Sequence, residues 1–167
     1  MPQTMPNRRD AVTRFRAMLS EEGIRPALEF LNGISVHRFT AVFMFDGGTL
    51  RNLHLIDRED RSVERCPDLP VLDSYCLYVR DTARQFMTEH ALKDARVDGH
   101  PKQKVVQSYC GYPLQDMRGE LIGTICHFDY APVPFDEQEV YLLEQVGPLL
   151  AEAISEMEQS PSVNRSA

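Results

Sequence analysis

The residues best suited to chemistry lie in one stretch, SYCGYPLQDMRGELIGTICHFD, at positions 108–129. It holds Cys110, Cys126 and His127, and thiols and imidazoles serve proteins as nucleophiles, redox groups and zinc ligands. Adjacent residues on a strand point to opposite faces, so Cys126 and His127 are poorly placed to share one metal ion. The four cysteines form no CxxC pair. We therefore predict no metal site.

The two cysteines of this stretch matter most if they meet across the turn at 116–119. If Cys110 pairs with Cys126, both thiols share one face of the sheet, and a reversible disulfide switch is feasible. If the register slips by one, Cys110 faces Ile125 and the thiols diverge. Buried cysteines more often act as small apolar groups. For His127 two assignments likewise stay open, a position in the core or a position that lines the pocket.

Composition restricts the class of protein. The formal charge is −7 and no dense Lys/Arg cluster is present, so a nucleic-acid surface is not expected. The longest apolar run, AVFMF at 41–45, is far too short to span a membrane. A secretory signal has an apolar segment after its basic residues, and the N-terminus of this chain has none. We expect a cytoplasmic protein whose cysteines are reduced, with neither nucleic acid nor membrane as a partner.

Helices and a hairpin are predicted in the first third of the chain. Asn7 is expected to cap a helix that Gly23 ends, and a second helix should end at Gly33. Strand-like runs at 38–46 and 49–57 flank a Gly-Gly pair, which is the pattern of a β-hairpin.

The later elements must position the cysteines. In LIGTICHF the residues are apolar on both faces, which favours a central strand covered on both sides. Asp136 and Glu139 have the spacing of a capping box at the start of a long helix, which Pro148 should kink or loosen. The other predicted segments are a surface loop at 57–70, a short helix at 70–82, a strand at 84–90, a helical turn and loop at 90–103, and a disordered tail at 158–167.

Two stretches together resemble a known family. YCGYPLQDMRGELIGTICHFD followed by PVPFDEQEVYLLEQVGPLLAEAI resembles the C-terminal half of GAF domains, and RFTAVFMFDGGTLRNLHLID resembles their first hairpin. The resemblance implies an α/β (α+β) fold, a central six-stranded antiparallel sheet with helices on both faces. It divides the chain into an N-terminal helix at 1–24, a GAF domain at 25–157 and the tail.

The resemblance also implies a function. GAF domains typically bind a small molecule between one sheet face and the segments over it, and often pair through their terminal helices. We expect a non-catalytic sensor that binds an unidentified small molecule or senses redox state, with no cofactor. With only the tail after the closing helix, it would signal through a homodimer or a signalling protein. A further hypothesis is a dimeric interaction module that binds no ligand.

An enzyme of the same fold is the main alternative. Cys66 and Cys76 match the spacing of two cysteines of free methionine-(R)-sulfoxide reductases, and the segment at 98–100 resembles the one before their nucleophilic cysteine. That cysteine falls on Gln103 here, and the family's two pocket carboxylates fall at Cys126 and Phe128. Glutamine supplies no thiolate, so no catalytic residue is predicted.

The sequence contains no motif typical of GAF domains that bind cyclic nucleotides or bilins. The Asn-Lys…Phe-Asp-Glu motif of cyclic-nucleotide GAF domains has no counterpart, and the Cys126-His127 pair lies in the wrong element for bilin attachment. The candidate ligand-binding residues are Tyr75, Cys76, Glu89, Asp94, Tyr109, Cys110 and His127. The candidate redox residues are Cys66, Cys76, Cys110 and Cys126.

Overall fold

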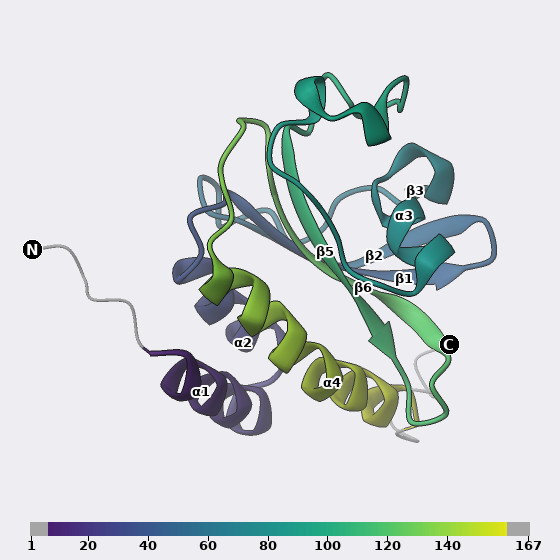
Figure 1. Ribbon diagram of the computed structural model, residues 1–167. Coiled ribbons are helices and arrows are strands. Elements are labelled where there is room, and N and C mark those ends of the chain that lie inside the picture. The colour runs from purple at the N-terminus through teal and green to yellow at the C-terminus, as the bar shows by residue number, and fades with distance from the viewer. Residues whose placement is uncertain (1–6, 160–167) are drawn as a thin grey trace, which may run out of the picture.

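A single antiparallel sheet organises the molecule. The computed structural model describes residues 7–159, so the N-terminal hexapeptide and most of the predicted disordered tail lie outside the described residues. The strands follow one another across the sheet in the order β3-β2-β1-β6-β5-β4 (Figure 1). Their bounds are β1 Phe39–Asp46, β2 Thr49–Asp57, β3 Leu69–Pro70, β4 Phe86–Thr88, β5 Ser108–Gln115 and β6 Leu121–Asp129.

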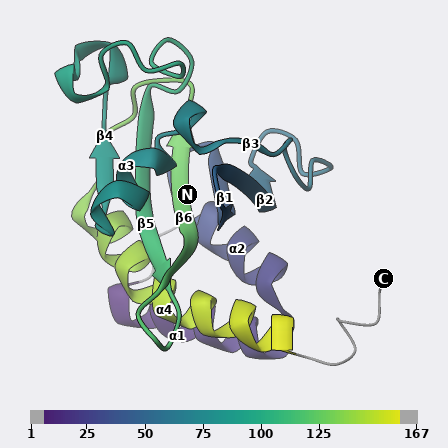
Figure 2. The same cartoon turned by 90° about the vertical axis from the view of Figure 1, so that its right-hand side faces the viewer.

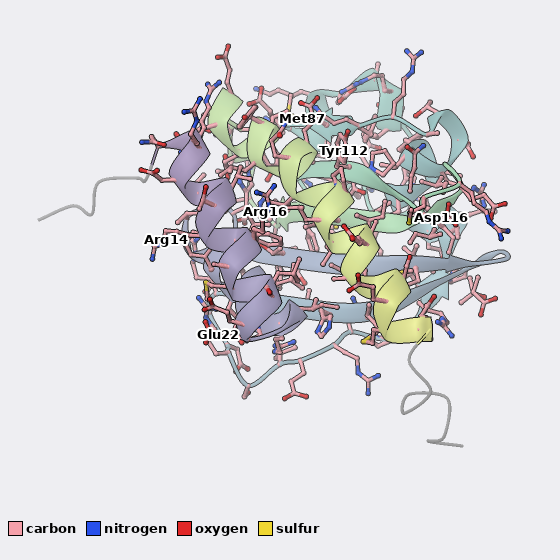
Figure 3. All side chains as sticks on the ribbon, turned by 90° about the horizontal axis from the view of Figure 1, so that it is seen from below. Arg14, Arg16, Glu22, Met87, Tyr112 and Asp116 are labelled. Atoms are coloured by element: carbon pink, nitrogen blue, oxygen red, sulfur yellow. The ribbon has the colours of Figure 1, made fainter. Side chains whose placement is uncertain are left out.

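Helices cover both faces of this sheet. Helices α1 (Arg8–Glu21), α2 (Ile24–Gly33) and α4 (Glu137–Gln159) lie on one face, which we call the helix side (Figure 1). Seen toward that face, α1 and α4 lie side by side across the strands (Figure 3). Helix α3 (Cys76–Thr82) lies over β5 on the other face, the pocket side (Figure 2). The predicted fold, a six-stranded antiparallel sheet between helical layers, is confirmed.

The helix ends follow from local hydrogen bonding. Asn7 caps α1, because its side-chain oxygen accepts from the Asp10 N–H at 2.9 Å. At α4, the Asp136 carboxylate accepts from the Glu139 N–H at 2.8 Å, and the Glu139 carboxylate accepts from the Asp136 N–H at 3.4 Å. This is the predicted capping box. Pro148 lies inside α4, so the helix continues through it although one backbone hydrogen bond is lost.

Strand β6 lies between β1 and β5 and is buried on both faces, because a hydrophobic core packs against each side of the sheet. Ile125 packs into the core of the helix side, whereas Cys126 packs into the core of the pocket side. Alternation along one strand therefore separates neighbouring residues into two different environments. The prediction of a central strand for LIGTICHF is confirmed.

The register of β5 against β6 differs from both predicted registers. Beside the turn, Gln115 pairs with Leu121, but the next pair is Leu114 with Gly123, so Ile122 is an extra residue. Such a bulge shifts all later pairs by one. Consequently Cys110 pairs with His127, and Cys126 pairs with Gly111. Cys110 and Cys126 lie on opposite faces of the sheet, so the predicted disulfide switch between them is geometrically excluded.

Short elements account for the remaining differences. The segment predicted as a surface loop at 57–70 ends in the two-residue edge strand β3. The helix predicted at 70–82 divides into a 3₁₀ turn, Val71–Asp73, and α3. Two further 3₁₀ turns, Ala91–Lys93 and Ala95–Val97, lie in the segment predicted as a helical turn and loop.

Candidate functional site

A cavity of about 320 Å³ lies between the pocket side of the sheet and the segments above it. Strands β1, β2, β5 and β6 form its floor, and the segments at 66–69, 74–75 and 102–106 form its cover. A concave site of this size, mostly apolar and with a few polar groups, is typical of small-molecule binding sites. The cavity lies where the resemblance placed a ligand.

Aromatic side chains form one wall of the cavity. The rings of Phe39 and Phe128 stack with centroids 4.7 Å apart, and the Tyr130 ring meets Phe39 edge-on at 5.0 Å. Tyr130 and Val105, each about half exposed, stand at the rim. An aromatic wall favours a ligand with an apolar, aromatic body, because contacts between rings add to the burial of its surface.

Few polar groups line this cavity, and most of them already have partners. The Asp68 carboxylate accepts from the Asn52 N–H at 3.0 Å, and the Tyr75 hydroxyl donates to the Val106 carbonyl at 3.0 Å. Burial raises the pKa of Tyr75 to about 12, so its phenol stays neutral. Lys102 adds one positive charge to the lining. The polar lining is thus nearly balanced in charge, which suits a ligand of low net charge.

Three cysteines and two hydroxyls lie at or next to the cavity. Cys126 on its floor and Cys66 in its cover line the cavity, and Cys76 is fully buried at the first position of α3. The Cys76 sulfur lies 3.2 Å from the Tyr109 hydroxyl and 3.2 Å from the Thr124 hydroxyl. Of the predicted site residues, Tyr75, Cys76 and Tyr109 are therefore brought together here, as are Cys66 and Cys126.

Two other predicted pocket residues lie on the opposite face. Cys110 belongs to the helix-side core, and His127 is buried beside it on the neighbouring strand. Alternation along each strand explains this, because the adjacent residues Tyr109 and Cys126 face the cavity. Neither side chain can reach the cavity from there. Their assignment to the ligand pocket is corrected.

Glu89 and Asp94 are also separate from the cavity. They lie in a polar groove formed by residues 87–90 and 93–96. The Glu89 carboxylate accepts from the Phe135 N–H at 2.8 Å, and Asp94 binds Arg96 through two oxygens. The Arg96 guanidinium lowers the pKa of Asp94 to about 2. Both carboxylates fix loops and do not contact the cavity.

A buried polar network on the helix side escaped the sequence analysis. The Glu139 carboxylate accepts from the Ser35 hydroxyl at 2.7 Å and lies 3.1 Å from Nδ1 of His37. Nε2 of His37 lies 3.0 Å from the Val133 carbonyl oxygen. The network ties the first turn of α4 to the segment before β1.

The second part of this network reaches the middle of the sheet. Nδ1 of His127 lies 2.8 Å from the Thr40 hydroxyl, which also accepts from the Asn32 side-chain amide at 3.0 Å. Burial, opposed by the Glu139 carboxylate, lowers the pKa of His127 to about 4. His127 therefore stays neutral at pH 7 and shares a strand with the cavity residue Cys126.

The depressed pKa of His127 makes stability depend on pH. In the unfolded chain His127 titrates near 6.5, whereas in the folded chain it titrates near 4. Between these values only the unfolded state gains a proton, so acidification from pH 6.5 to pH 4 favours unfolding, by about 3 kcal/mol. Urea unfolding at pH 7 and pH 4.5 measures this loss. The loss should shrink in His127→Gln and persist in His90→Gln; an equal loss in both variants would contradict the prediction.

Some of the missed residues left a readable pattern in the sequence. Phe39, Ala41 and Phe43 alternate along β1 and all face the pocket side. Such alternation marks one face of a strand, although it does not say which layer covers that face. The partnership of His37 with Glu139 leaves no such mark, because more than a hundred positions separate the two residues.

Neither a metal-binding cluster nor a membrane-spanning helix is found among the described residues. Within residues 7–159, no group of three or more His, Cys, Asp or Glu side chains is arranged to hold a metal ion. Among the helices of the same range, none combines the length and the apolar character that crossing a bilayer requires.

Comparisons with known proteins come from sequence and from structure. A model of the GAF domain family matches residues 21–154. The comparison with curated protein sequences gave no match. The GAF domain of a phosphoenolpyruvate-protein phosphotransferase from Coxiella burnetii superposes with a TM-score of 0.72 at 12% identity, covering 93% of this chain and 97% of that one.

Two further structures show how widely this fold is used. The free methionine-R-sulfoxide reductase of Neisseria meningitidis, solved with its substrate, gives a TM-score of 0.72 at 14% identity and covers 91% of this chain and 90% of its own. A phycocyanobilin-bound GAF domain from a cyanobacterial phytochrome gives 0.71 at 14%, covering 93% and 99%. At these identities the likeness concerns the fold alone. Because the family model spans most of the chain, this protein belongs to the GAF domain family.

Proposed function

We propose that this GAF domain is a regulatory module that binds a small, largely planar and apolar molecule in the cavity on the pocket side of the sheet. The observation that supports the proposal most is the cavity itself, about 320 Å³ in volume and walled by stacked aromatic rings. Similar structures agree with such a role, since they include the GAF domain of a two-component sensor histidine kinase and a phycocyanobilin-bound GAF domain.

The position of Gln103 supports regulation over sulfoxide reduction. Its side-chain amide donates to the Asp98 carboxylate at 3.1 Å and to the Ala91 carbonyl at 3.2 Å, and its side-chain oxygen accepts from the Gly99 N–H at 3.0 Å. These hydrogen bonds hold the loop in place, and Gln103 occupies the position that the nucleophilic cysteine has in the reductase family. Turnover of free methionine sulfoxide with thioredoxin, abolished by Cys76→Ser, would overturn the proposal.

Closing the rim of the cavity tests ligand binding directly. Val105 is half exposed at the rim, so Val105→Trp should block entry with little effect on stability. With anilinonaphthalene sulfonate as the probe, we expect the wild type to bind with enhanced fluorescence and Val105→Trp to bind at least about tenfold more weakly. Val36→Trp is the matched control, because Val36 is equally exposed but lies outside the cavity. Equal binding by both variants would sink the proposal.

Native mass spectrometry of freshly purified protein complements this test. A retained ligand would appear as a mass difference that is lost on denaturation, and the same spectrum gives the subunit count. Pairing of two copies through α1 and α4, and contact with a signalling protein, stay predictions. The subunit count tests the first of them.

A further inference from the structure

The two thiols Cys76 and Cys126 differ from ordinary core cysteines in what surrounds them. Cys76 is fully buried, yet hydroxyls from separate elements converge on its sulfur: Tyr109 of β5 and Thr124 of β6, each at 3.2 Å. Cys126 follows Thr124 by two residues on the same face of β6 and belongs to the same buried cluster as Cys76 and Tyr109. A neutral thiol is a weak hydrogen-bond partner, so two hydroxyls on one sulfur suit a thiolate better than a packed S–H group.

Gly111 keeps the Tyr109 hydroxyl in this position. A Cβ atom added at residue 111 would lie 2.2 Å from the Tyr109 hydroxyl oxygen. Gly111 pairs with Cys126 across the sheet, so its missing side chain leaves the space that the phenol fills next to the two sulfurs. Glycine on a strand often marks such a close approach.

The electrostatics of the four cysteines agree with this geometry. Burial raises the pKa of Cys76, but hydrogen bonds from Cys126, Ser74, Thr124 and Tyr109 outweigh it and lower the pKa to about 7. Burial raises the pKa of Cys110 to about 12 and that of Cys66 and Cys126 above the ordinary value. Of these four thiols, Cys76 is therefore the one that ionises most readily near neutral pH.

The pair also has a route to small reactants. Cys126 belongs to the wall of the cavity, whereas Cys76 lies outside the lining, and both side chains are buried in one cluster. Cys66 lines the same cavity, and Cys110 lies on the other face of the sheet. A reactant that enters the cavity thus reaches the wall that contains Cys126.

We propose that Cys76 and Cys126 are a redox-active dithiol, which a hydroperoxide that enters the cavity converts to a disulfide joining α3 to β6. The proposal relies on the proposed function only for the cavity as an entry route, and it needs no bound ligand. Its partners are peroxides small enough to fit the cavity.

The reaction balances without a further reagent. Transfer of the Cys126 proton to the Cys76 thiolate leaves Cys126 as the thiolate, which attacks the terminal peroxide oxygen. The O–O bond breaks, the Cys126 sulfur becomes a sulfenic acid, and the alkoxide leaves as the alcohol with the proton of Cys76. The Cys76 thiolate then attacks the sulfur of Cys126. The S–S bond forms and hydroxide leaves, taking a proton from solvent to give water.

Peptide mapping tests the proposal, because cleavage before aspartate separates all four cysteines. The peptides are 60–67 with Cys66, 73–80 with Cys76, 98–115 with Cys110 and 116–128 with Cys126. The reduced full chain is treated with cumene hydroperoxide, alkylated in denaturant and digested without reductant. We expect 73–80 linked to 116–128, two hydrogen masses below the sum of the free peptides, in the wild type and equally in Cys66→Ser and Cys110→Ser. Linkage of 60–67 to 73–80, or four separately modified peptides, would overturn the proposal.

A rate measurement distinguishes an activated pair from two thiols that merely lie close. Thr124→Val keeps the side-chain volume but removes one hydroxyl from the Cys76 sulfur. At pH 7 we expect disulfide formation to slow about fivefold, and the rate to recover at higher pH, because the pKa of Cys76 rises by about one unit. An unchanged rate would contradict the proposal. Probe binding by the reduced protein is measured separately, so failure of the cavity and failure of the dithiol give different results.

Discussion

Replacing Glu139 by alanine is expected to lower the free energy of unfolding by about 4 kcal/mol, because it removes a buried carboxylate that is the partner of several hydrogen-bonding groups. The carboxylate is almost fully buried and accepts from the Ser35 hydroxyl and the Val36 N–H in addition to its contact with His37. Alanine would leave these donors without a partner inside the protein. Urea unfolding at pH 7, followed by circular dichroism, measures the loss.

Glu137 provides the control for this substitution. It stands in the same first turn of α4, but its side chain is 96% exposed. Glu137→Ala should change the free energy of unfolding by no more than about 0.5 kcal/mol. If the two alanine variants lost the same stability, the network around Glu139 would have no special role.

Acid titration gives a second test of the same carboxylate. Burial opposes ionisation of Glu139, but hydrogen bonds from His37 and Ser35 lower its pKa from 4.5 to about 2. A depressed carboxyl pKa stabilises the fold above the unfolded value, and this stabilisation is lost as the pH falls from 4.5 toward 2. In Glu139→Gln that part of the acid-unfolding curve should flatten.

Replacing Gly123 by alanine is expected to destabilise the fold by about 3 kcal/mol or more, because the centre of the sheet has no room for a methyl group. A Cβ atom at this position would lie 2.1 Å from the Phe43 carbonyl oxygen and 3.1 Å from the Met44 sulfur. Backbone atoms cannot rotate away as a flexible side chain can, so β1 and β6 would have to separate. Urea unfolding and amide hydrogen exchange in both strands measure the effect.

Gly48 is the matched control for Gly123→Ala. It lies in the turn between β1 and β2, and a Cβ atom added there meets no heavy atom within 4 Å. Gly48→Ala should leave the free energy of unfolding within about 0.5 kcal/mol of the wild-type value. Comparable losses in both variants would mean that backbone entropy, and not the contact with Phe43, causes the loss of stability in Gly123→Ala.

Local signals in the sequence predicted most of the fold. Asn7, Gly23 and the Asp136–Glu139 pair mark helix ends through hydrogen bonds within a few residues, so the sequence contains all the information that their prediction needs. The hairpin at 38–57 was readable for the same reason, since a Gly-Gly pair separates two strand-like runs.

The assignment of faces could not be predicted, because it depends on one bulged residue. Nothing in the run of apolar residues around Ile122 marks it as extra, yet its insertion pairs Cys110 with His127 and not with Cys126. Side chains on a strand have a period of two, so a shift of one residue exchanges the two faces. The grouping of Cys76 with Cys126 was hidden likewise, because packing of α3 on the sheet, and not spacing along the chain, places both residues in one cluster.

The attachment of α4 has a mechanical consequence. Directional hydrogen bonds hold its first turn at Glu139, whereas Leu150 and Ile154 are held by apolar packing, which has no preferred direction. The first turn is therefore a fulcrum, and α4 is a lever of 23 residues, about 34 Å long. A tilt of about 5° at the fulcrum would displace the far end by about 3 Å. This geometry amplifies a small adjustment of the sheet into a movement about equal to the rise of one residue along a strand.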